Sequence, residues 1–288
     1  MEKLRHGWQM LQLKYRERWD EGLGGSMQYK TITYELESGL AKIMFNRPEA
    51  GHAINRDFVY EFMDVAIRST TDPNVRCIMI SATGSIYGFG GDLKFFSSEI
   101  DRIEATLIEL TAVLHQAIQR FHYCKVPLII AVNGMAAGGG FSLALFSDLV
   151  IASRSAKFVM AYTNAGLSPD GSSSYYLPRI VGLRRAQELM LTNRMLTAEE
   201  AQDWGIVTKV VEEEILLVEA EALGRRLAKG PTKAYGAVKK LLSRTFEQTL
   251  ESQLEEESKL IAKMGGSADG REGLDAFLNK RKPSFKGE

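Results

Sequence analysis

The chain has 288 residues, 45% of them apolar, and its 36 Lys plus Arg residues balance 36 Asp plus Glu residues, so the formal net charge is zero. This is a globular composition, and it excludes a disordered chain, which needs low hydrophobicity and high net charge. It also argues against an electrostatic nucleic-acid binder, because no excess of basic residues attracts phosphate. The length allows one large domain or two small ones.

The N-terminal segment, residues 1–26, alternates charged and apolar residues and ends in the flexible sequence GLGGS before Met27. It lacks the apolar run of a secretory signal, and we expect an extension or cloning remnant outside the fold, or else a helix that docks on a partner. Cys77 and Cys124 are too few for a zinc site or a disulfide scaffold and suit a reducing cytoplasm. No apolar run reaches the roughly 18 residues of a membrane span.

The first half of the chain after Met27 alternates strand and helix patterns. In chain order, the pattern predicts strands over 29–34 and 40–45, a helix over 56–70, a strand over 75–81, a glycine-rich loop over 84–91 and a helix over about 99–121. Glu37, Ser38 and Gly39 are turn residues between the first two strands.

The second half begins with a continuous apolar run that predicts a strand buried on both faces. In chain order, we expect that strand over 127–132, a small-residue loop over 134–140, the start of a helix at 143–146, a strand over 149–152, and mostly helix from 184. Thr197 is the expected N-cap of one late helix. Strands separated by helices predict right-handed crossovers and a buried parallel sheet. We therefore expect one α/β core through about residue 190 and a helical C-terminal part.

A loop rich in Gly and Ala, VNGMAAGGG, joins the buried strand directly to the next helix. The first amide N–H groups of a helix have no internal partner, and the macrodipole adds partial positive charge there. The loop therefore fits a phosphate site or half of an oxyanion hole, with the second loop, SIYGFGGDL, supplying the other N–H. Neither Rossmann nor P-loop spacing is present. The alternative is that the glycines only permit close packing of helix and strand.

Six stretches carry a resemblance that runs from Ala41 to Lys282: KIMFNRPEAGHAIN, GFGGDLKFF, KVPLIIAVNGMAAGGGFSLALFSD, KFVMAYTNAGLSPDGSSSYYLPRIVG, LTAEEAQDWGIVTKVV and DGREGLDAFLNKRKP. In this order and spacing, the chain resembles the crotonase (enoyl-CoA hydratase/isomerase) superfamily. The resemblance implies an α/β fold like that of Clp proteases, with a spiral core of ββα turns over 27–220. It also implies a helical C-terminal trimerisation region over 221–288.

The resemblance further implies acyl-CoA thioester substrates and an oxyanion hole made by the N–H groups of Gly91 and Gly139. Both donors would stabilise a thioenolate, and losing one donor costs about two to three powers of ten in rate. Hydratases of this family use two glutamates, and the matching positions here are Ser142 and Tyr162. Because neither is a carboxylate, we expect an isomerase rather than a simple hydratase.

Asp170 occupies the position where several family members carry an acid on the loop that faces the acyl group. In site pattern the chain resembles the branch of the phenylacetate-pathway epoxide-CoA isomerase, and in related enoyl-CoA isomerases such an acid moves a proton between the α- and γ-carbons. One base is enough because it returns the proton that it removed. We expect an apolar lining to raise the pKa of Asp170. The alternative is an ordinary turn at Pro169-Asp170-Gly171.

His115 is a second catalytic candidate, because the chain also resembles the 4-chlorobenzoyl-CoA dehalogenase branch. There a catalytic histidine matches His115, a nucleophilic aspartate matches Asp170, and an aromatic residue matches Tyr162. Tyr162 is accordingly expected to stack on the acyl group or to donate its hydroxyl. Ser142, His115 and Asp170 are also the residue types of a hydrolase triad. The sequence GFSLA around Ser142 is not the GxSxG elbow, which weighs against that reading.

Coenzyme A is expected here as part of the substrate and not as a resident cofactor. Ser142 and Phe89 are expected in the acyl pocket and Ala53 on the CoA path, while Phe277 and Lys280 of a neighbouring chain would reach the phosphates. A solvated charge run is the alternative for the basic C-terminal segment. We expect no metal, flavin or nicotinamide site, and a homotrimer or a hexamer built as a dimer of trimers, in the cytoplasm.

The combined expectation is an acyl-CoA isomerase that uses Asp170 as proton shuttle. One alternative is dehalogenase-like or thioester-hydrolase chemistry through Asp170 and His115. Another is a non-catalytic scaffold that binds CoA or RNA, against which the zero net charge and the intact glycine pair weigh.

Overall fold

The computed structural model describes residues 29–288, so the expected N-terminal extension lies outside the described residues. Its largest sheet has the strand order β1-β2-β3-β5-β7-β10. The strands are β1 (Ile32–Glu37), β2 (Leu40–Phe45), β3 (Cys77–Ala82), β5 (Leu128–Val132), β7 (Leu149–Ser153) and β10 (Lys209–Val211). All neighbours are parallel except β1 and β2, which form a hairpin. This confirms the predicted parallel sheet, although the first strand begins three residues later than expected.

A second, smaller sheet has the order β4-β6-β8-β9. Its strands are β4 (Ile86–Gly88), β6 (Met135–Ala137), β8 (Lys157–Val159) and β9 (Leu196–Thr197). Two of them lie inside the segments expected to be loops, because very short strands of small residues carry no alternating pattern. Each of β3, β5 and β7 continues into β4, β6 and β8 and then into helix, which gives the spiral of ββα turns that characterises the crotonase fold.

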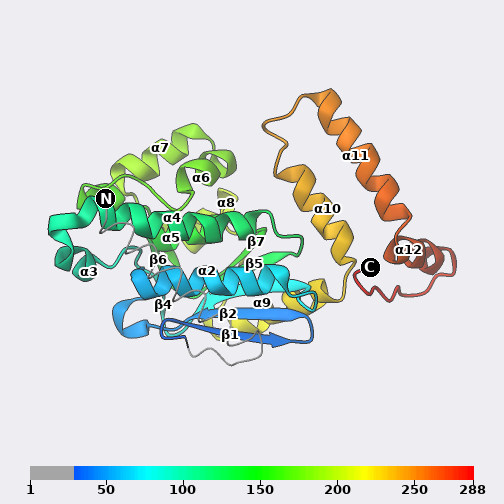
Figure 1. The fold of residues 1–288 in the computed structure, drawn as a ribbon, viewed down its shortest axis with the longest axis horizontal. Coiled ribbons are helices and arrows are strands. Elements are labelled where there is room, and N and C mark those ends of the chain that lie inside the picture. Colours follow the sequence, from blue (N-terminus) through cyan, green and yellow to red (C-terminus); the bar gives the residue numbers. More distant parts are fainter. Residues whose placement is uncertain (1–28) are drawn as a thin grey trace, which may run out of the picture.

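Helices cover both faces of the larger sheet (Figure 1). The helices of residues 29–288 are α2 (Arg56–Thr71), α3 (Leu93–Ser98), α4 (Ile103–His122), α5 (Gly139–Leu145), α6 (Ser173–Val181), α7 (Leu183–Thr192), α8 (Ala198–Asp203), α9 (Leu216–Ala228), α10 (Thr232–Leu242), α11 (Leu250–Gly265) and α12 (Ala268–Leu278), with 3₁₀ turns at Pro48–Ala50, Ile100–Arg102, Tyr162–Ala165 and Glu213–Ile215. The main core lies between the sheet and α2 and α4, and a smaller core lies between its other face and α9. β5 is buried along its whole length, as its continuous apolar run predicted.

Two helix starts differ from expectation, and both border the site described below. The helix expected from residue 99 begins at Ile103, after the separate short helix α3, which Asp92 caps. The helix expected from 143 begins at Gly139, so the glycines form its first turn and not a preceding loop. Thr197 caps α8 as predicted, in a full capping box with Glu200.

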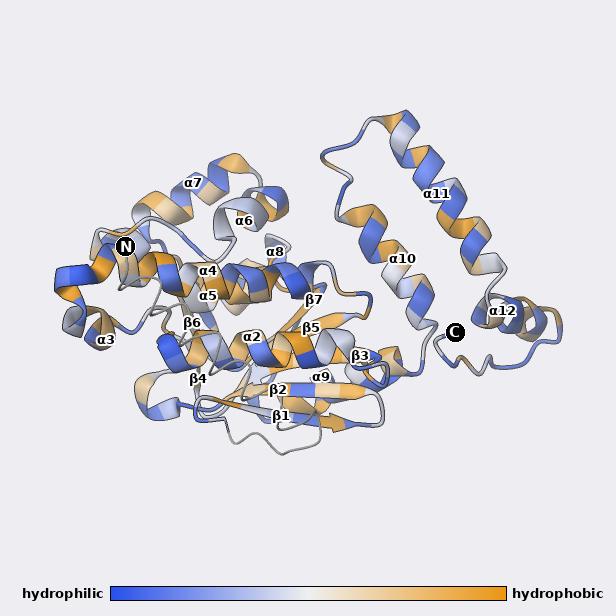
Figure 2. Ribbon diagram, viewed as in Figure 1, coloured by the Kyte–Doolittle hydropathy of each residue, from blue (hydrophilic) through white to orange (hydrophobic). Residues whose placement is uncertain are grey.

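The C-terminal helices α10, α11 and α12 form an arm that extends away from the core (Figure 1). The boundary expected at residue 220 falls inside α9, which packs under the sheet with Leu216 and Ala220 buried. The arm helices are amphipathic (Figure 2), and apolar side chains such as Leu254 and Ile261 are exposed on them. Within residues 29–288, no helix has both the length and the hydropathy needed to cross a membrane.

Candidate active site

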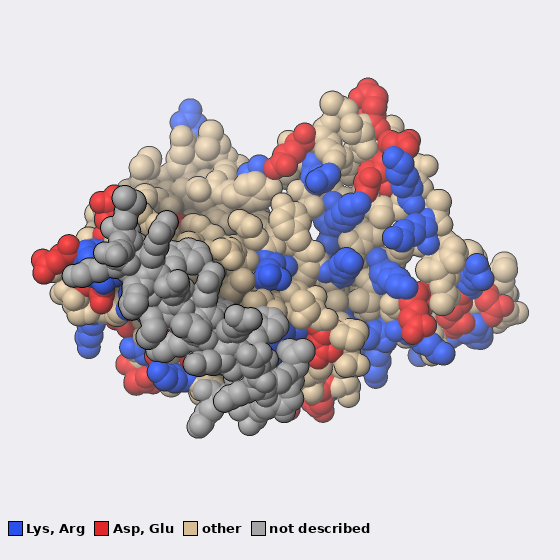
Figure 3. All heavy atoms as spheres, viewed as in Figure 1, with Lys and Arg blue, Asp and Glu red and all other residues tan. Residues whose placement is uncertain are grey.

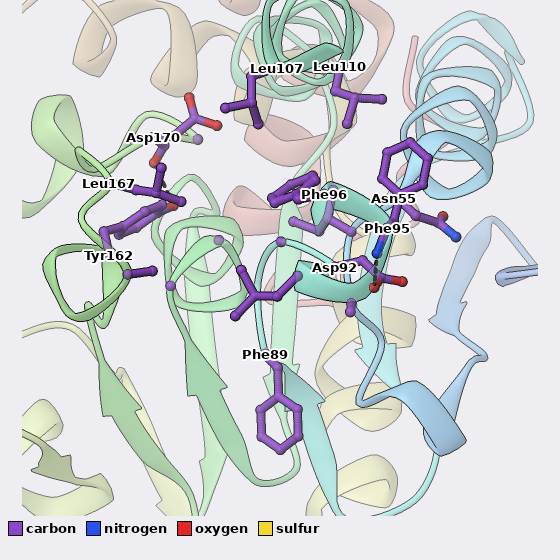
Figure 4. A pocket seen from close by; sticks show the side chains of 18 of the residues that line it. Asn55, Phe89, Asp92, Phe95, Phe96, Leu107, Leu110, Tyr162, Leu167 and Asp170 are labelled. Atoms are coloured by element: carbon purple, nitrogen blue, oxygen red, sulfur yellow. Dashed lines mark hydrogen bonds between the residues drawn. The ribbon is translucent and has the colours of Figure 1, made fainter. Parts of the chain in front are cut away.

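A cavity of about 1140 Å³ opens beside the loops that follow β2, β4 and β6 and under the N-terminal half of α4. Figure 4 shows Tyr162 and Leu167 on one side of it, opposite Phe96 and the α4 side chains Leu107 and Leu110. The lining is therefore apolar and partly aromatic. A cavity with this lining fits a bulky apolar group better than a highly charged one.

The two glycines expected to form an oxyanion hole, Gly91 and Gly139, both lie in the lining of this cavity. The bridge between Ile54 and Gly91 uses the Ile54 N–H, which donates to the Gly90 carbonyl at 2.7 Å, and leaves the Gly91 N–H without a partner among the described residues. Gly139 is the first residue of α5, so its N–H is likewise free of an intrahelical bond. A Cβ on Gly90 would lie 2.6 Å from the Gly139 nitrogen, so the two loops touch. Two unpaired N–H groups on neighbouring loops of one cavity are the kind of donors that an oxyanion hole needs, and that role stays a prediction.

Tyr162 and Ser142 form a hydroxyl pair behind this wall. The Ser142 Oγ lies 2.8 Å from the Tyr162 hydroxyl, which donates to the main-chain carbonyl of Asp170 at 3.2 Å. Ser142 is fully buried and outside the cavity lining, and from the first turn of α5 its side chain faces Gly171; its expected place in the acyl pocket stays a prediction. Burial raises the pKa of Tyr162 far above its ordinary value, so the phenol stays neutral.

Asp170 lines the cavity from the loop before α6, and His115 contacts it from α4. The His115 Nε2 lies 2.6 Å from the Asp170 Oδ1. Asp170 is part of the cavity lining and His115 is not. The structure thus brings together the two residues that the sequence placed 55 positions apart.

The pKa of Asp170 moves in the direction opposite to the one expected. Burial alone would raise it, but the hydrogen bonds from His115 and the Gly171 N–H, with the charge of His115, hold the pKa of Asp170 below its ordinary value. The hydrogen bond to Asp170 raises the pKa of His115 despite burial. Both shifts favour the charged forms, so the contact stabilises an ion pair between the imidazolium and the carboxylate.

The mouth of the cavity carries two cations, Arg47 and Lys94. The Arg47 Nη1 donates to the Asp92 Oδ2 at 2.8 Å and to the Ala53 carbonyl at 3.3 Å, and Ala53 lies in the lining, while its expected contact with CoA stays a prediction. Asp92 also caps α3 by accepting from the Phe95 N–H at 3.1 Å. Arg47 and Lys94 were not among the residues expected in the site. The one signal near them in the sequence is Asp92, because an Asp before a helix is a typical N-cap.

The remaining expected site residues are more exposed. Phe89 is among the lining residues and half-exposed, and Figure 4 shows its ring directed away from the other labelled side chains, so its expected place in the acyl pocket stays a prediction. Phe277 ends α12 and is 82% exposed, and Lys280 follows it, both outside the lining of this cavity. Their expected role was toward a neighbouring chain and stays a prediction. Among residues 29–288, no three His, Cys, Asp or Glu side chains are grouped to hold a metal ion.

Comparison with known proteins shows the family to which the chain belongs. The family model described as Enoyl-CoA hydratase/isomerase matches residues 35–288. A protein named "Probable enoyl-CoA hydratase" from Rhodobacter capsulatus is 39% identical over 91% of this chain and 100% of its own. The 1,2-epoxyphenylacetyl-CoA isomerase of Escherichia coli is 36% identical over 89% of this chain and 98% of its own. The crystal structure of an enoyl-CoA hydratase from Polaromonas sp. JS666 is similar with a TM-score of 0.85 and 30% identity, covering 88% of this chain and 99% of that one.

Proposed function

The chain belongs to the enoyl-CoA hydratase/isomerase (crotonase) family of acyl-CoA enzymes, and from that premise we propose that it isomerises a double bond or ring in an acyl-CoA thioester, with Asp170 as proton shuttle. One observation carries the proposal: the carboxylate of Asp170 lines the same cavity as Gly91 and Gly139, whereas the buried pair at Ser142 and Tyr162 is neutral. Of the other acidic lining residues, Asp92 is held by Arg47 and Glu49 is largely exposed.

The reaction divides between the amides and the carboxylate. The thioester oxygen accepts from the N–H groups of Gly91 and Gly139, which stabilise the negative charge of a thioenolate. Asp170 removes a proton from one carbon of the acyl group and returns it to another, so the C–H bond broken and the C–H bond formed use the same proton. His115 keeps Asp170 ionised and ready to accept. Water addition is disfavoured because no second carboxylate stands by to activate water.

Asp170→Asn tests the shuttle on a panel of 2-enoyl-, 3-enoyl-, cyclic and aryl-CoA thioesters. Asparagine keeps the shape but cannot hold the proton, so we expect isomerisation to fall by about two to four powers of ten. Free CoA should still raise the melting temperature of the variant, which would show that the binding site for the CoA moiety is intact. Full turnover in Asp170→Asn, or hydrated acyl-CoA as the main wild-type product, would contradict the proposal. Failure of free and acetyl-CoA to stabilise the wild type would favour the non-catalytic scaffold.

The 2.6 Å contact between His115 and Asp170 favours one alternative, hydrolytic chemistry through a covalent aspartyl ester. The Asp170 carboxylate would attack an aryl carbon, halide would leave with its bonding pair, and water would cleave the ester. Esterification removes the aspartate charge, so His115 would then be freed to act as base. A single turnover in ¹⁸O-labelled water distinguishes the routes: the covalent route puts ¹⁸O into Asp170, and isomerisation leaves it unlabelled.

We further propose that CoA is held only as part of the substrate. Arg47 and Lys94 in the cavity lining, with the Ala53 carbonyl that accepts from Arg47, provide charge and hydrogen bonding for the anionic, nucleotide-bearing CoA moiety. Copies of the chain are proposed to associate through the arm as trimers or hexamers, which would bring Phe277 and Lys280 to a neighbour. The two buried free cysteines fit the proposed cytoplasmic location.

A further inference from the structure

The helix α4 carries two histidines on one face, and each contacts the segment that contains Asp170. His115 and His122 are seven residues apart, and a heptad returns to within about 20° of the same direction on a helix. His115 contacts Asp170, and the His122 Nδ1 lies 2.5 Å from the Tyr176 hydroxyl. Asp170 precedes α6 and Tyr176 lies in its first half, so two side-chain bridges about two helical turns apart join α4 to this segment.

The surroundings of Tyr176 and His122 determine which of the two donates in their hydrogen bond. Burial raises the pKa of Tyr176 far above its ordinary value, so its hydroxyl keeps its proton and donates. Burial, with the nearby Lys239, lowers the pKa of His122 against the opposite influence of Asp148 and Glu247, so the imidazole is neutral and its Nδ1 accepts. The rings also pack edge to face, with centroids 5.8 Å apart. The bridge is thus a neutral, partly buried hydrogen bond.

The loop of Asp170 is rigidly attached to the start of α6. The Ser173 Oγ donates to the Asp170 carbonyl at 2.9 Å, and the Ser173 N–H points to the same oxygen at 3.3 Å. Gly171 and Ser172 both adopt positive φ, 61° and 69°, which makes a compact turn. Any shift of α6 relative to α4 therefore moves the Asp170 carboxylate relative to His115.

We propose that His122 and Tyr176 are a positioning pair that holds α6 against α4 and so keeps Asp170 in its ion pair with His115. Neither residue lines the cavity, and neither touches the reacting atoms. Their catalytic effect depends on the role proposed for Asp170 above, but their effect on the ion pair does not. Loss of the Tyr176 hydroxyl should make the contact between His115 and Asp170 longer or less populated, while the packing of the Tyr176 ring on His122 stays in place.

Tyr176→Phe removes one oxygen and keeps the aromatic ring. The primary measurement is the pKa of His115 from histidine side-chain NMR, which needs no turnover. We expect that pKa to fall by about half a unit or more, because a looser carboxylate stabilises the imidazolium less. On an accepted acyl-CoA, kcat should fall several-fold with little change in KM, since the CoA contacts at the mouth are untouched.

Tyr175→Phe is the matched control. Tyr175 is the preceding residue of α6, but its hydroxyl donates to Glu247 at 3.3 Å and not to α4. We expect the pKa of His115 to stay at its wild-type value there. His122→Gln removes the acceptor from the other side and should reproduce the effect, and the His122→Gln/Tyr176→Phe double variant should add little to either single change. An unchanged pKa of His115 in Tyr176→Phe and His122→Gln, or an equal fall in Tyr175→Phe, would overturn the proposal.

Discussion

At the residue scale, the ion pair between Asp170 and His115 determines what the site can do. A carboxylate in an apolar lining would be a strong base with a raised pKa, but the neighbouring imidazole reverses that shift. The Asp170 carboxylate is therefore ionised at physiological pH. His115 gives up its proton more readily when the carboxylate is protonated or esterified, because the negative charge that raises its pKa is then gone. The neutral pair at Ser142 and Tyr162 adds hydrogen bonding without adding charge.

The ion pair predicts a specific pH dependence of stability. The raised pKa of His115 means that its contribution is present below its ordinary value of 6.5 and is lost as pH rises through the folded-state pKa. The lowered pKa of Asp170 means that its contribution is present above 3.8 and is lost as pH falls through the folded-state pKa. The stability difference between wild type and His115→Gln should therefore be largest between about pH 4 and 6.5, at about 1 kcal/mol or less because both groups are partly exposed.

Urea unfolding at pH 5 and pH 9 measures this difference. A difference that is equal at both pH values would contradict the ion pair.

At the scale of elements, the capping residue of the short helix α3 joins Arg47 to Gly91, one of the two glycines in the cavity lining. Asp92 follows Gly91 directly, caps α3 and accepts from Arg47, which in turn contacts Ala53. The aromatic ring of Phe96 in α3 lies so close to Gly91 that a Cβ there would meet it at 2.5 Å. Asp92 thus links the loop of Arg47 and Ala53 to Gly91 and to the helix that carries Phe96.

Substitutions of Asp92 separate its two roles. Asn is as good an N-cap as Asp, so Asp92→Asn should keep α3 and lose only the charge opposite Arg47. We expect a raised KM for acyl-CoA and little loss of stability. Asp92→Ala should additionally lower the free energy of unfolding by about 1 kcal/mol, and should lower kcat as the Gly91 amide moves.

Steady-state kinetics and urea unfolding of both variants check this prediction. Equal stability and equal kinetics in the two variants would show that the cap does not act on the site.

At the scale of the whole molecule, the zero net charge hides an uneven distribution. Figure 3 shows several Lys and Arg side chains gathered over α10 and α11 on the face that it presents, with acidic groups beside them, among them Glu255 and Glu256, which pair with Lys259 and Lys240. The arm also exposes apolar side chains, including Leu250, Leu254 and Ile261, on one face of α11. A single chain gains nothing by exposing such a face, and we propose that a second copy covers it.

Leu254→Glu combined with Ile261→Glu tests the covered face. Both side chains are exposed in one chain, so the monomer should still fold, while charges on the face should weaken association. Light scattering after size exclusion should give a mass above that of the 32.1 kDa chain for wild type and a lower mass for the variant. A monomeric wild type, or an unchanged mass in the variant, would rule out this face as the contact.

The sequence by itself determined the class of fold and the glycine pair, because buried parallel strands need continuous apolar runs and close loops need Gly wherever they touch. It also singled out Asp170 and His115 as candidates. Only the tertiary structure decided that these two side chains form an ion pair. It also decided that Ser142 is buried outside the cavity lining and that α5 begins at Gly139. These outcomes depend on distances between segments far apart in the chain, and local patterns of apolar and polar residues carry no information about such distances. The sign of the pKa shift of Asp170 depended on the same contact, since burial and a charged neighbour push in opposite directions.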